Sequence, residues 1–367
     1  MTKVIERPHI RLASLGSVAK DAIALLSAQG LAGTLELARQ GVGPRYTVTT
    51  NRRLIEARQS DEKGGRLDDN ARAREVETIL ADDRIAALVT LRGGGWFTRI
   101  LDKINFDVLR RRRKTIHIFG FSEMTSLVNI AGRYPRAVGL YDLGPAFLID
   151  CLTQKALRKA PLASVQEKQA GGRRRPSKDI SDPEMCEKAS EAFRSFFSDV
   201  GHILDGQGSR RSLTGRLLFG TLPKQKEITV VGGNLSVVMP LLASPFAKAV
   251  DTKNRWLALE DVNESPSSID RMLAGLRLAG LLERVEGILL GDFHSGDTDL
   301  NDAAWQILKR HLPTRRKVPV VALKGFGHIH PIAPLPVHRP ITLRCTKPDR
   351  GRPRVHIEIP WNKWTYR

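Results

Sequence analysis

A strand that becomes a helix across a three-residue link, between residues 114 and 132, constrains the fold of this chain most. Residues 114–119 are mostly β-branched or apolar and hold no Gly or Pro, which is typical of a buried strand. After residues 120–122, apolar residues recur at the i, i+3, i+4, i+7 spacing of a helix. So sharp a turn would hold the Ser122 hydroxyl beside the free N–H groups of the helix N-terminus, as in a nucleophile elbow. An N-cap serine is the alternative, because the turn lacks the second Gly of Gly-x-Ser-x-Gly.

Alternating apolar runs and helical patterns in the first part of the chain predict an α/β fold with a parallel sheet. Three glycines, at 93–95, follow one buried run, and a Gly144-Pro145 turn follows another. With Ser122 they fall at the carboxyl edge of the predicted sheet, where such folds place their ligand site. The predicted strands are residues 9–15, 45–50, 85–91, 114–119 and 137–141, the predicted helices residues 18–40, 69–81 and 124–131, and the predicted loop residues 51–65.

The composition changes after residue 152. Residues 152–180 hold eight basic and two acidic residues and predict an exposed connection, before a helix at 185–203. We therefore divide the chain into residues 1–152, an N-terminal α/β domain, 153–214, a basic linker and helix, and 215–367, a C-terminal domain. The predicted strands of the last part are residues 227–231, 256–259, 287–290 and 318–323, with a closing antiparallel pair at 341–345 and 355–359.

The formal net charge of +20 is the unusual global property of the chain. A basic surface can indicate nucleic acid or an anionic surface as partner. The densest clusters, at 110–114 and 173–175, are not interleaved with aromatic residues as a surface that binds single strands would be. We interpret the charge as solvated surface and expect no specific nucleic-acid partner.

The remaining global features indicate a cytoplasmic protein. No run of about 18 apolar residues is present, so we expect no membrane-spanning helix. The first residues hold no apolar stretch of a signal peptide. Cys151, Cys186 and Cys345 stand in no metal-binding pattern, which fits a reducing compartment and predicts no metal site.

A serine nucleophile needs a base, and the base needs an acid that orients it. Among nine histidines, His328 follows a predicted strand on a glycine-flanked loop, and His330 is close enough to be an alternative. Glu260 stands at the end of a predicted strand, with Asp261 and Glu264 in the following turn. Glu260 and His328 also have a structural interpretation, as a buried carboxylate that holds loop N–H groups and a loop imidazole bonded to backbone.

Seven short motifs carry a resemblance to a known family. They are Arg92-Gly93-Gly94, Gly120-Phe-Ser122-Glu-Met-Thr125, Gly232-Gly233-Asn234-Leu235, Leu259-Glu260-Asp261 with Glu264, Ile269-Asp270-Arg271-Met272-Leu273, Gly287-Ile-Leu-Leu-Gly291-Asp292-Phe293 and Gly325-Phe-Gly-His328. Their types and order resemble the LD-carboxypeptidase family, which comprises murein tetrapeptide LD-carboxypeptidases and microcin C immunity carboxypeptidases. The resemblance spans roughly residues 10–150 and 215–345.

This resemblance implies a serine hydrolase without metal or cofactor. Its N-terminal domain would have a Rossmann-like parallel sheet similar to class I glutamine amidotransferases, followed by a smaller β-rich C-terminal domain. Carried over by motif, Ser122 would be the nucleophile, His328 the general base and acid, and Glu260 the residue that orients it.

The resemblance also assigns the surroundings of the serine. The oxyanion hole would be the backbone N–H groups of Gly94 and Glu123. The implied substrate-binding residues are Arg92, Gly93, Gly144 and Pro145.

The implied reaction releases the C-terminal D-amino acid of murein tetrapeptides across an L,D-peptide bond, in peptidoglycan recycling, by a protein that is a homodimer. A peptidyl-nucleotide of the microcin C type is the alternative substrate. The chain departs from the family at Arg-Gly-Gly-Gly-Trp96, where Arg-Gly-Gly-Tyr-Gly is usual, and at Leu143-Gly-Pro, where His-Gly-Pro is common. Because of these departures the substrate stays open. The alternative from a different functional class is a non-catalytic, polyanion-binding protein of the same fold.

Overall fold

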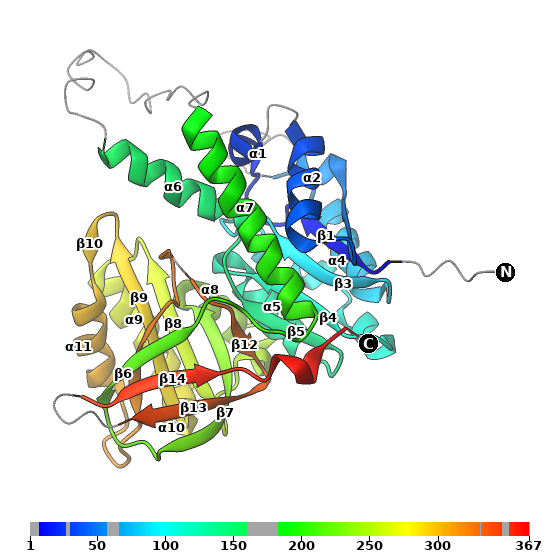
Figure 1. Cartoon of the computed structure of the whole chain (residues 1–367). Helices are drawn as coiled ribbons and strands as arrows, with labels where there is room; N and C mark the ends of the chain where they lie inside the picture. Colours follow the sequence, from blue (N-terminus) through cyan, green and yellow to red (C-terminus); the bar gives the residue numbers. More distant parts are fainter. Residues whose placement is uncertain are drawn as a thin grey trace.

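Two β-sheets, each formed mainly by one half of the chain, organise the computed structural model of this protein (Figure 1). The structure describes residues 7–26, 30–56, 66–159, 183–330, 332–346 and 352–366. The predicted basic connection at 152–180 mostly lies outside these ranges, since only residues 152–159 are described, as the end of a helix.

The first sheet has the order β12-β5-β4-β3-β1-β2 and is parallel except for β12. Strands β3, β4 and β5 are buried along their whole length, which is why they appear in the sequence as largely apolar runs, with His117 as a buried polar residue inside β4. The predicted parallel sheet is therefore confirmed. Its strands are β1 (His9–Ala13), β2 (Thr47–Thr50), β3 (Ile85–Thr90), β4 (Ile116–Gly120), β5 (Ala137–Tyr141) and β12 (Leu335–Val337).

Helices cover this sheet, and the longest of them, α7, packs against α1, α2 and α6 (Figure 1). The predicted long helix at 18–40 is two helices, α1 and α2, and part of the predicted loop at 51–65 is the short helix α3. The helices are α1 (Lys20–Leu26), α2 (Gly30–Val42), α3 (Arg52–Ile55), α4 (Asp69–Ala81), α5 (Thr125–Gly132), α6 (Pro145–Lys159) and α7 (Pro183–Leu204), with 3₁₀ turns η1 (Thr98–Lys103), η2 (Phe106–Arg111) and η3 (Ser122–Met124).

The second sheet has the order β10-β9-β11-β6-β14-β13-β7-β8, and an additional β8–β9 pairing closes it into a barrel. The predicted antiparallel pair is confirmed, with Thr342 opposite Glu358 and Thr346 opposite Arg354. The strands are β6 (Leu213–Phe219), β7 (Gln225–Asn234), β8 (Trp256–Val262), β9 (Gly287–Ser295), β10 (Thr298–Asp299), β11 (Val320–Lys324), β13 (Pro340–Thr346) and β14 (Arg354–Glu358). The helices are α8 (Leu235–Leu242), α9 (Pro266–Leu278), α10 (Leu281–Arg284) and α11 (Asn301–His311), with η5 (Ala247–Val250) and η6 (Trp361–Trp364).

The two sheets are joined by strand β12, which crosses from one half of the chain to the other, and by hydrogen bonds. Strand β12 comes from the C-terminal half but pairs antiparallel with β5 of the first sheet. Asn129 of α5 exchanges two hydrogen bonds with the backbone of Gly232 in β7, at 2.8 and 3.0 Å. Arg211 binds both Asp142, after β5, and Asp199 of α7. The boundaries after residues 152 and 214 remain predictions.

None of the described helices combines the length and the apolar character that crossing a bilayer requires.

Candidate active site

A strained backbone turn holds Ser122 at the carboxyl end of β4. Ser122 has φ +57°, a left-handed conformation that costs a non-glycine residue free energy and recurs at functional turns. A Cβ at Gly120 would lie 2.6 Å from the Cβ of Met124, so only glycine lets the chain fold back this tightly. The structure therefore has the turn of a nucleophile elbow, with Met124 in place of the second glycine.

Two elements of the barrel bring an acid and a base together. His328 follows β11, and its Nδ1 lies 2.7 Å from Oε2 of Glu260 in β8. Glu260 is fully buried, and the His328 side chain is 7% exposed. Sequence reasoning placed Glu260 at the end of its strand, but β8 continues to Val262. A carboxylate bound to Nδ1 fixes the tautomer and leaves Nε2 to accept a proton.

The surroundings of His328 set its basicity. Burial alone would lower its pKa, but the charge of Glu260 and the hydrogen bond to it outweigh burial, with smaller contributions from Asp261 and Asp292. The net result is a pKa above the usual value of the imidazole. Glu260 therefore stabilises the imidazolium that forms when His328 takes a proton.

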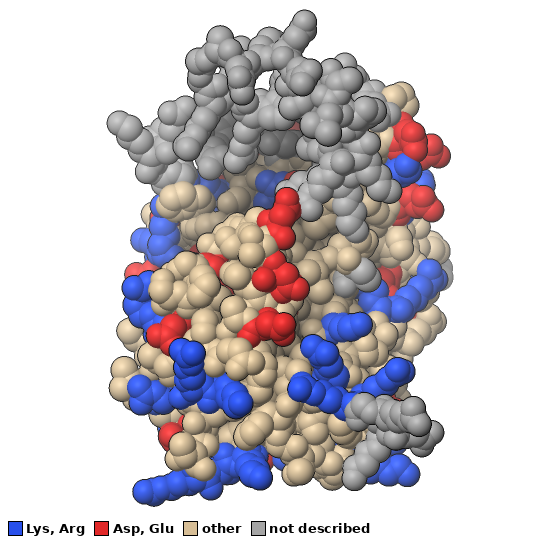
Figure 2. All heavy atoms as spheres, turned by 90° about the vertical axis from the view of Figure 1, so that its left-hand side faces the viewer, with Lys and Arg blue, Asp and Glu red and all other residues tan. Residues whose placement is uncertain are grey.

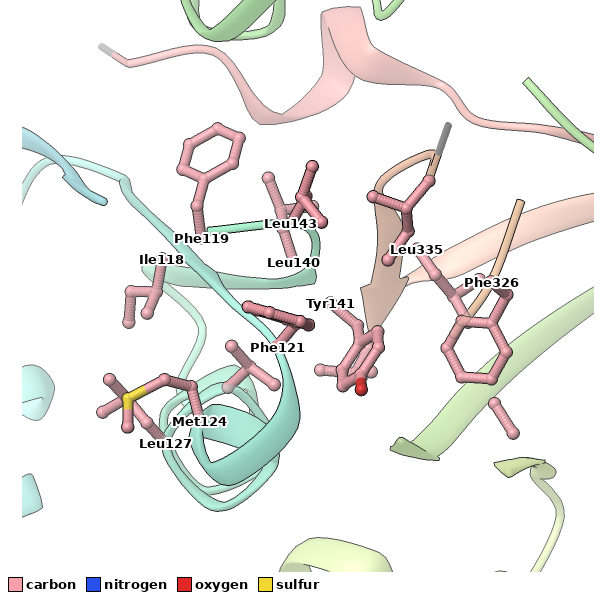
Figure 3. Packing of buried hydrophobic residues seen from close by; sticks show 14 of the residues in the cluster. Ile118, Phe119, Phe121, Met124, Leu127, Leu140, Tyr141, Leu143, Phe326 and Leu335 are labelled. Carbon is pink, nitrogen blue, oxygen red and sulfur yellow. The ribbon is translucent and has the colours of Figure 1, made fainter. Parts of the chain in front are cut away.

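Two aromatic rings pack against the imidazole. The His328 ring lies 5.2 Å from the ring of Phe121 and 5.7 Å, edge to face, from that of Phe147 in α6. Figure 3 shows Phe121 beside α5, next to the turn that carries Ser122. The Ser122 hydroxyl makes no hydrogen bond within the described ranges. Contacts between nucleophile and base are often long without substrate and tighten when it binds.

Two backbone N–H groups near Ser122 have no hydrogen-bond partner among the described residues. They belong to Gly94, in the loop after β3, and to Glu123, in the 3₁₀ turn η3 that precedes α5. The side chain of Glu123 accepts a 2.7 Å hydrogen bond from the N–H of Thr98 and so ties the elbow to the glycine loop. These are the N–H groups that the family resemblance assigns to the oxyanion hole, a role that remains a prediction.

Gly93 leaves room for the serine. A Cβ at this position would lie 2.6 Å from Cβ and 3.1 Å from Oγ of Ser122. We expect Gly93→Ala to displace the glycine loop from the elbow and to lower kcat about 10²- to 10³-fold, the loss typical of one oxyanion donor. Steady-state kinetics measure this effect.

Gly95→Ala is the matched control, because a Cβ there would meet no atom within 4 Å. We expect its kcat to stay close to wild type. Equal kinetics for Gly93→Ala and wild type would contradict the close packing of loop and elbow.

The other candidate acids and bases, Asp261, Glu264 and His330, lie in different surroundings from Glu260 and His328. Asp261 caps α8 by accepting hydrogen bonds from Ser236 N–H and Asn234 Nδ2, and burial, with the charge of Glu260, raises its pKa to about 6. Glu264 has no side-chain hydrogen bond or ion pair within the described residues. His330 lines two cavities, of about 1480 and 430 Å³. Glu260 and His328 are in direct contact, as described above.

The predicted substrate-binding residues lie around the same edge. Nη2 of Arg92 donates to both carboxylate oxygens of Asp150 in α6, at 2.8 Å each. Gly144 packs against the end of β3, where a Cβ would lie 2.6 Å from the Leu91 carbonyl oxygen, and Pro145 begins α6. Their contacts with substrate remain predictions.

Sequence reasoning missed Tyr141 and Phe147. The Tyr141 hydroxyl accepts a hydrogen bond from the Ser122 N–H at 3.1 Å and donates one to Glu260 Oε1 at 2.5 Å. The signal was weak, because a tyrosine that ends a buried strand is usually a core residue.

No group of three or more His, Cys, Asp and Glu side chains in the described ranges is arranged to hold a metal ion.

Figure 2 shows one face of the molecule, where most Lys and Arg side chains gather in the lower half and several Asp and Glu side chains lie nearer the middle. Both signs of charge therefore share this face.

Family comparisons match the chain in two parts. Residues 14–141 match the LD-carboxypeptidase N-terminal domain, and residues 228–343 match the LD-carboxypeptidase C-terminal domain. Together these matches cover more than half of the chain.

Individual relatives agree with this match. The chain is 26% identical to a probable murein peptide carboxypeptidase of Bacillus subtilis, over 73% of this chain and 72% of the relative. Its fold is similar to a muramoyltetrapeptide carboxypeptidase of Oxalobacter formigenes (TM-score 0.56, 19% identity, 96% of this chain and 99% of the other). It is also similar to the microcin C7 self immunity protein MccF in complex with aspartyl sulfamoyl adenosine (TM-score 0.58, 15% identity, 96% of each chain).

Proposed function

Because the chain belongs to the LD-carboxypeptidase family, we propose that it is a serine-type carboxypeptidase that releases the C-terminal D-amino acid of murein tetrapeptides. The observation that carries this proposal is the Glu260–His328 contact beside the strained turn at Ser122. A buried acid, an imidazole that it orients and a partly buried serine hydroxyl are the groups that acyl transfer requires.

The first half of the reaction forms an acyl-enzyme. Ser122 Oγ attacks the carbonyl carbon of the scissile L,D-peptide bond while His328 Nε2 takes its proton. The negative charge that develops on the carbonyl oxygen meets the N–H groups of Gly94 and Glu123. Each such donor is worth about 2.7–4 kcal/mol of barrier. Glu260 holds the imidazolium, which then protonates the amine of the departing D-amino acid.

The second half reverses these roles. Water enters where the D-amino acid left, and His328 Nε2 takes a proton from it as its oxygen attacks the acyl carbon. The tetrahedral intermediate collapses, the shortened peptide leaves, and Ser122 recovers its proton from His328. The Phe121 and Phe147 rings shield the imidazole from bulk water, which strengthens its interaction with Glu260.

The test is the release of D-alanine from L-Ala-γ-D-Glu-meso-diaminopimelate-D-Ala. We expect free D-alanine from this peptide and no L-alanine from the matched peptide that ends in L-Ala, because the proposed enzyme selects the configuration at the bond it cleaves. Chiral chromatography of the products measures both. Failure of the wild-type protein to release D-alanine would contradict the murein substrate.

A peptidyl-nucleotide is the second candidate substrate, and Trp96 is the observation in its favour. Its side chain is 36% exposed at the end of the glycine loop, and the Arg99 guanidinium lies 5.1 Å from the ring centroid. An exposed indole can stack on a nucleobase. Hydrolysis of aspartyl sulfamoyl adenosine without cleavage of the tetrapeptide would decide for this substrate.

We propose further that the protein acts in cytoplasmic peptidoglycan recycling and as a homodimer. Cysteine usage supports the compartment, and the family resemblance supports the dimer. Sedimentation analysis measures the oligomeric state.

A further inference from the structure

Tyr141 connects the proposed nucleophile to the proposed acid through one oxygen atom. It is the last residue of β5 in the first sheet, whereas Glu260 lies in β8 of the second. Its hydroxyl donates to Glu260 Oε1 at 2.5 Å and accepts the N–H of Ser122 at 3.1 Å. This oxygen therefore joins the elbow to the barrel that supplies the acid and the base.

The ring of Tyr141 is held in one place. It is fully buried, and Figure 3 shows it beside Phe326, with ring centroids 5.1 Å apart. Leu335 of β12 pairs with it across the sheet. Burial first, and then the charge of Glu260 and the hydrogen bond to it, raise the pKa of Tyr141 well above its usual value. The hydroxyl therefore stays protonated and remains a donor to Glu260.

Both oxygens of Glu260 are engaged by different partners. Oε1 accepts from Tyr141, while Oε2 lies against Nδ1 of His328. A carboxylate that receives two hydrogen bonds divides its negative charge between them, so Tyr141 and His328 compete for it. The Ser122 N–H is also occupied by Tyr141, which leaves the N–H groups of Gly94 and Glu123 as the oxyanion donors.

We propose that Tyr141 is a positioning residue. Its hydroxyl holds the Glu260 carboxylate next to the Ser122 turn and reduces the stabilisation that Glu260 gives to protonated His328. This inference rests on the proposed roles of Ser122, Glu260 and His328. It assigns Tyr141 no contact with substrate.

The test is the rate at which a fluorophosphonate labels Ser122 across pH, in wild type and in Tyr141→Phe. In this reaction a bond forms between Ser122 Oγ and phosphorus, the P–F bond breaks, fluoride leaves, and His328 takes the hydroxyl proton. We expect labelling to slow about tenfold or more, the loss typical of a hydrogen bond to a charged group. The acid limb of the profile should move to higher pH, because Glu260 without its second donor holds the proton on His328 more tightly.

The tetrapeptide supplies a second readout. Because Tyr141 does not touch substrate, the change should appear in kcat with KM close to wild type. A variant with 3-fluorotyrosine at position 141 keeps the hydroxyl and the fold and makes the phenol a stronger donor. The acid limb of its pH profile should move to lower pH. This variant therefore still tests the inference if Tyr141→Phe fails to fold.

Tyr46→Phe is the matched control. Tyr46 is also buried and donates to a carboxylate, Oδ1 of Asp205, at 2.6 Å, but it belongs to neither the elbow nor the barrel. We expect it to leave the pH profile unchanged. An unshifted acid limb in both position-141 variants, or an equal shift in Tyr46→Phe, would overturn the inference.

Failure of the proposed function gives a different result. In that case the wild-type protein would resist the fluorophosphonate, or Ser122→Ala would be labelled as fast as wild type. Labelling that requires Ser122 but is the same in wild type and in the Tyr141 variants would overturn only the positioning role of Tyr141.

Discussion

Replacing Ser122 by Ala is expected to abolish turnover while the protein stays folded. Removal of the serine from a hydrolase triad lowers kcat on the order of 10⁶-fold, since no other group forms the acyl-enzyme. The hydroxyl of Ser122 makes no hydrogen bond within the described part of the chain, so its loss should change the free energy of unfolding by less than about 0.5 kcal/mol. Tetrapeptide kinetics and thermal unfolding measure the two effects separately.

Ser126→Ala is the control for this prediction. Ser126 lies one turn further along the chain, and its hydroxyl donates a hydrogen bond to the carbonyl of Glu123 at 3.1 Å. The same chemical change there should leave kcat near wild type. Substantial turnover by well-folded Ser122→Ala would contradict the nucleophile assignment. If neither variant nor wild type cleaved any peptide while the protein bound polyanions in a salt-dependent manner, the non-catalytic alternative would gain support.

Replacing Glu260 by Gln is expected to lower kcat about 10⁴-fold, as the loss of the orienting acid does in other triads. Gln keeps the shape of the side chain but removes the charge that stabilises protonated His328. The pH dependence should change as well. Glu260 is the main reason that the pKa of His328 is raised, and without it burial dominates and lowers that pKa. The acid limb of kcat/KM should therefore move to lower pH, although the rate is smaller throughout.

Glu264→Gln is the matched control, because Glu264 lies nearby on the chain and has no side-chain partner among the described residues. Its kinetics and pH profile should equal those of wild type. An acid limb that moves upward in Glu260→Gln would mean that another group sets the charge of His328.

The α/β class and the turn at Ser122 could be predicted because both depend on local patterns. Strands buried on two faces must be apolar throughout, and a helix with one buried face must repeat every three or four residues. Strand β12 was missed for the converse reason. It has three residues, one of them proline, and it forms only because β5 offers it an edge. The short helix α3 likewise lacks a sequence signal strong enough to distinguish it from a loop.

Patterns along the chain were enough to predict the fold class, most strands of both sheets, the turn at Ser122 and a short set of candidate acids and bases. The tertiary structure decided which of them meet, because Glu260 and His328 are 68 residues apart and contact each other only once β8, β9 and β11 pair. It also decided that Tyr141 lies between Ser122 and Glu260. Hydrogen bonds reach only about 3 Å, and no spacing along the chain encodes a distance between separate sheets.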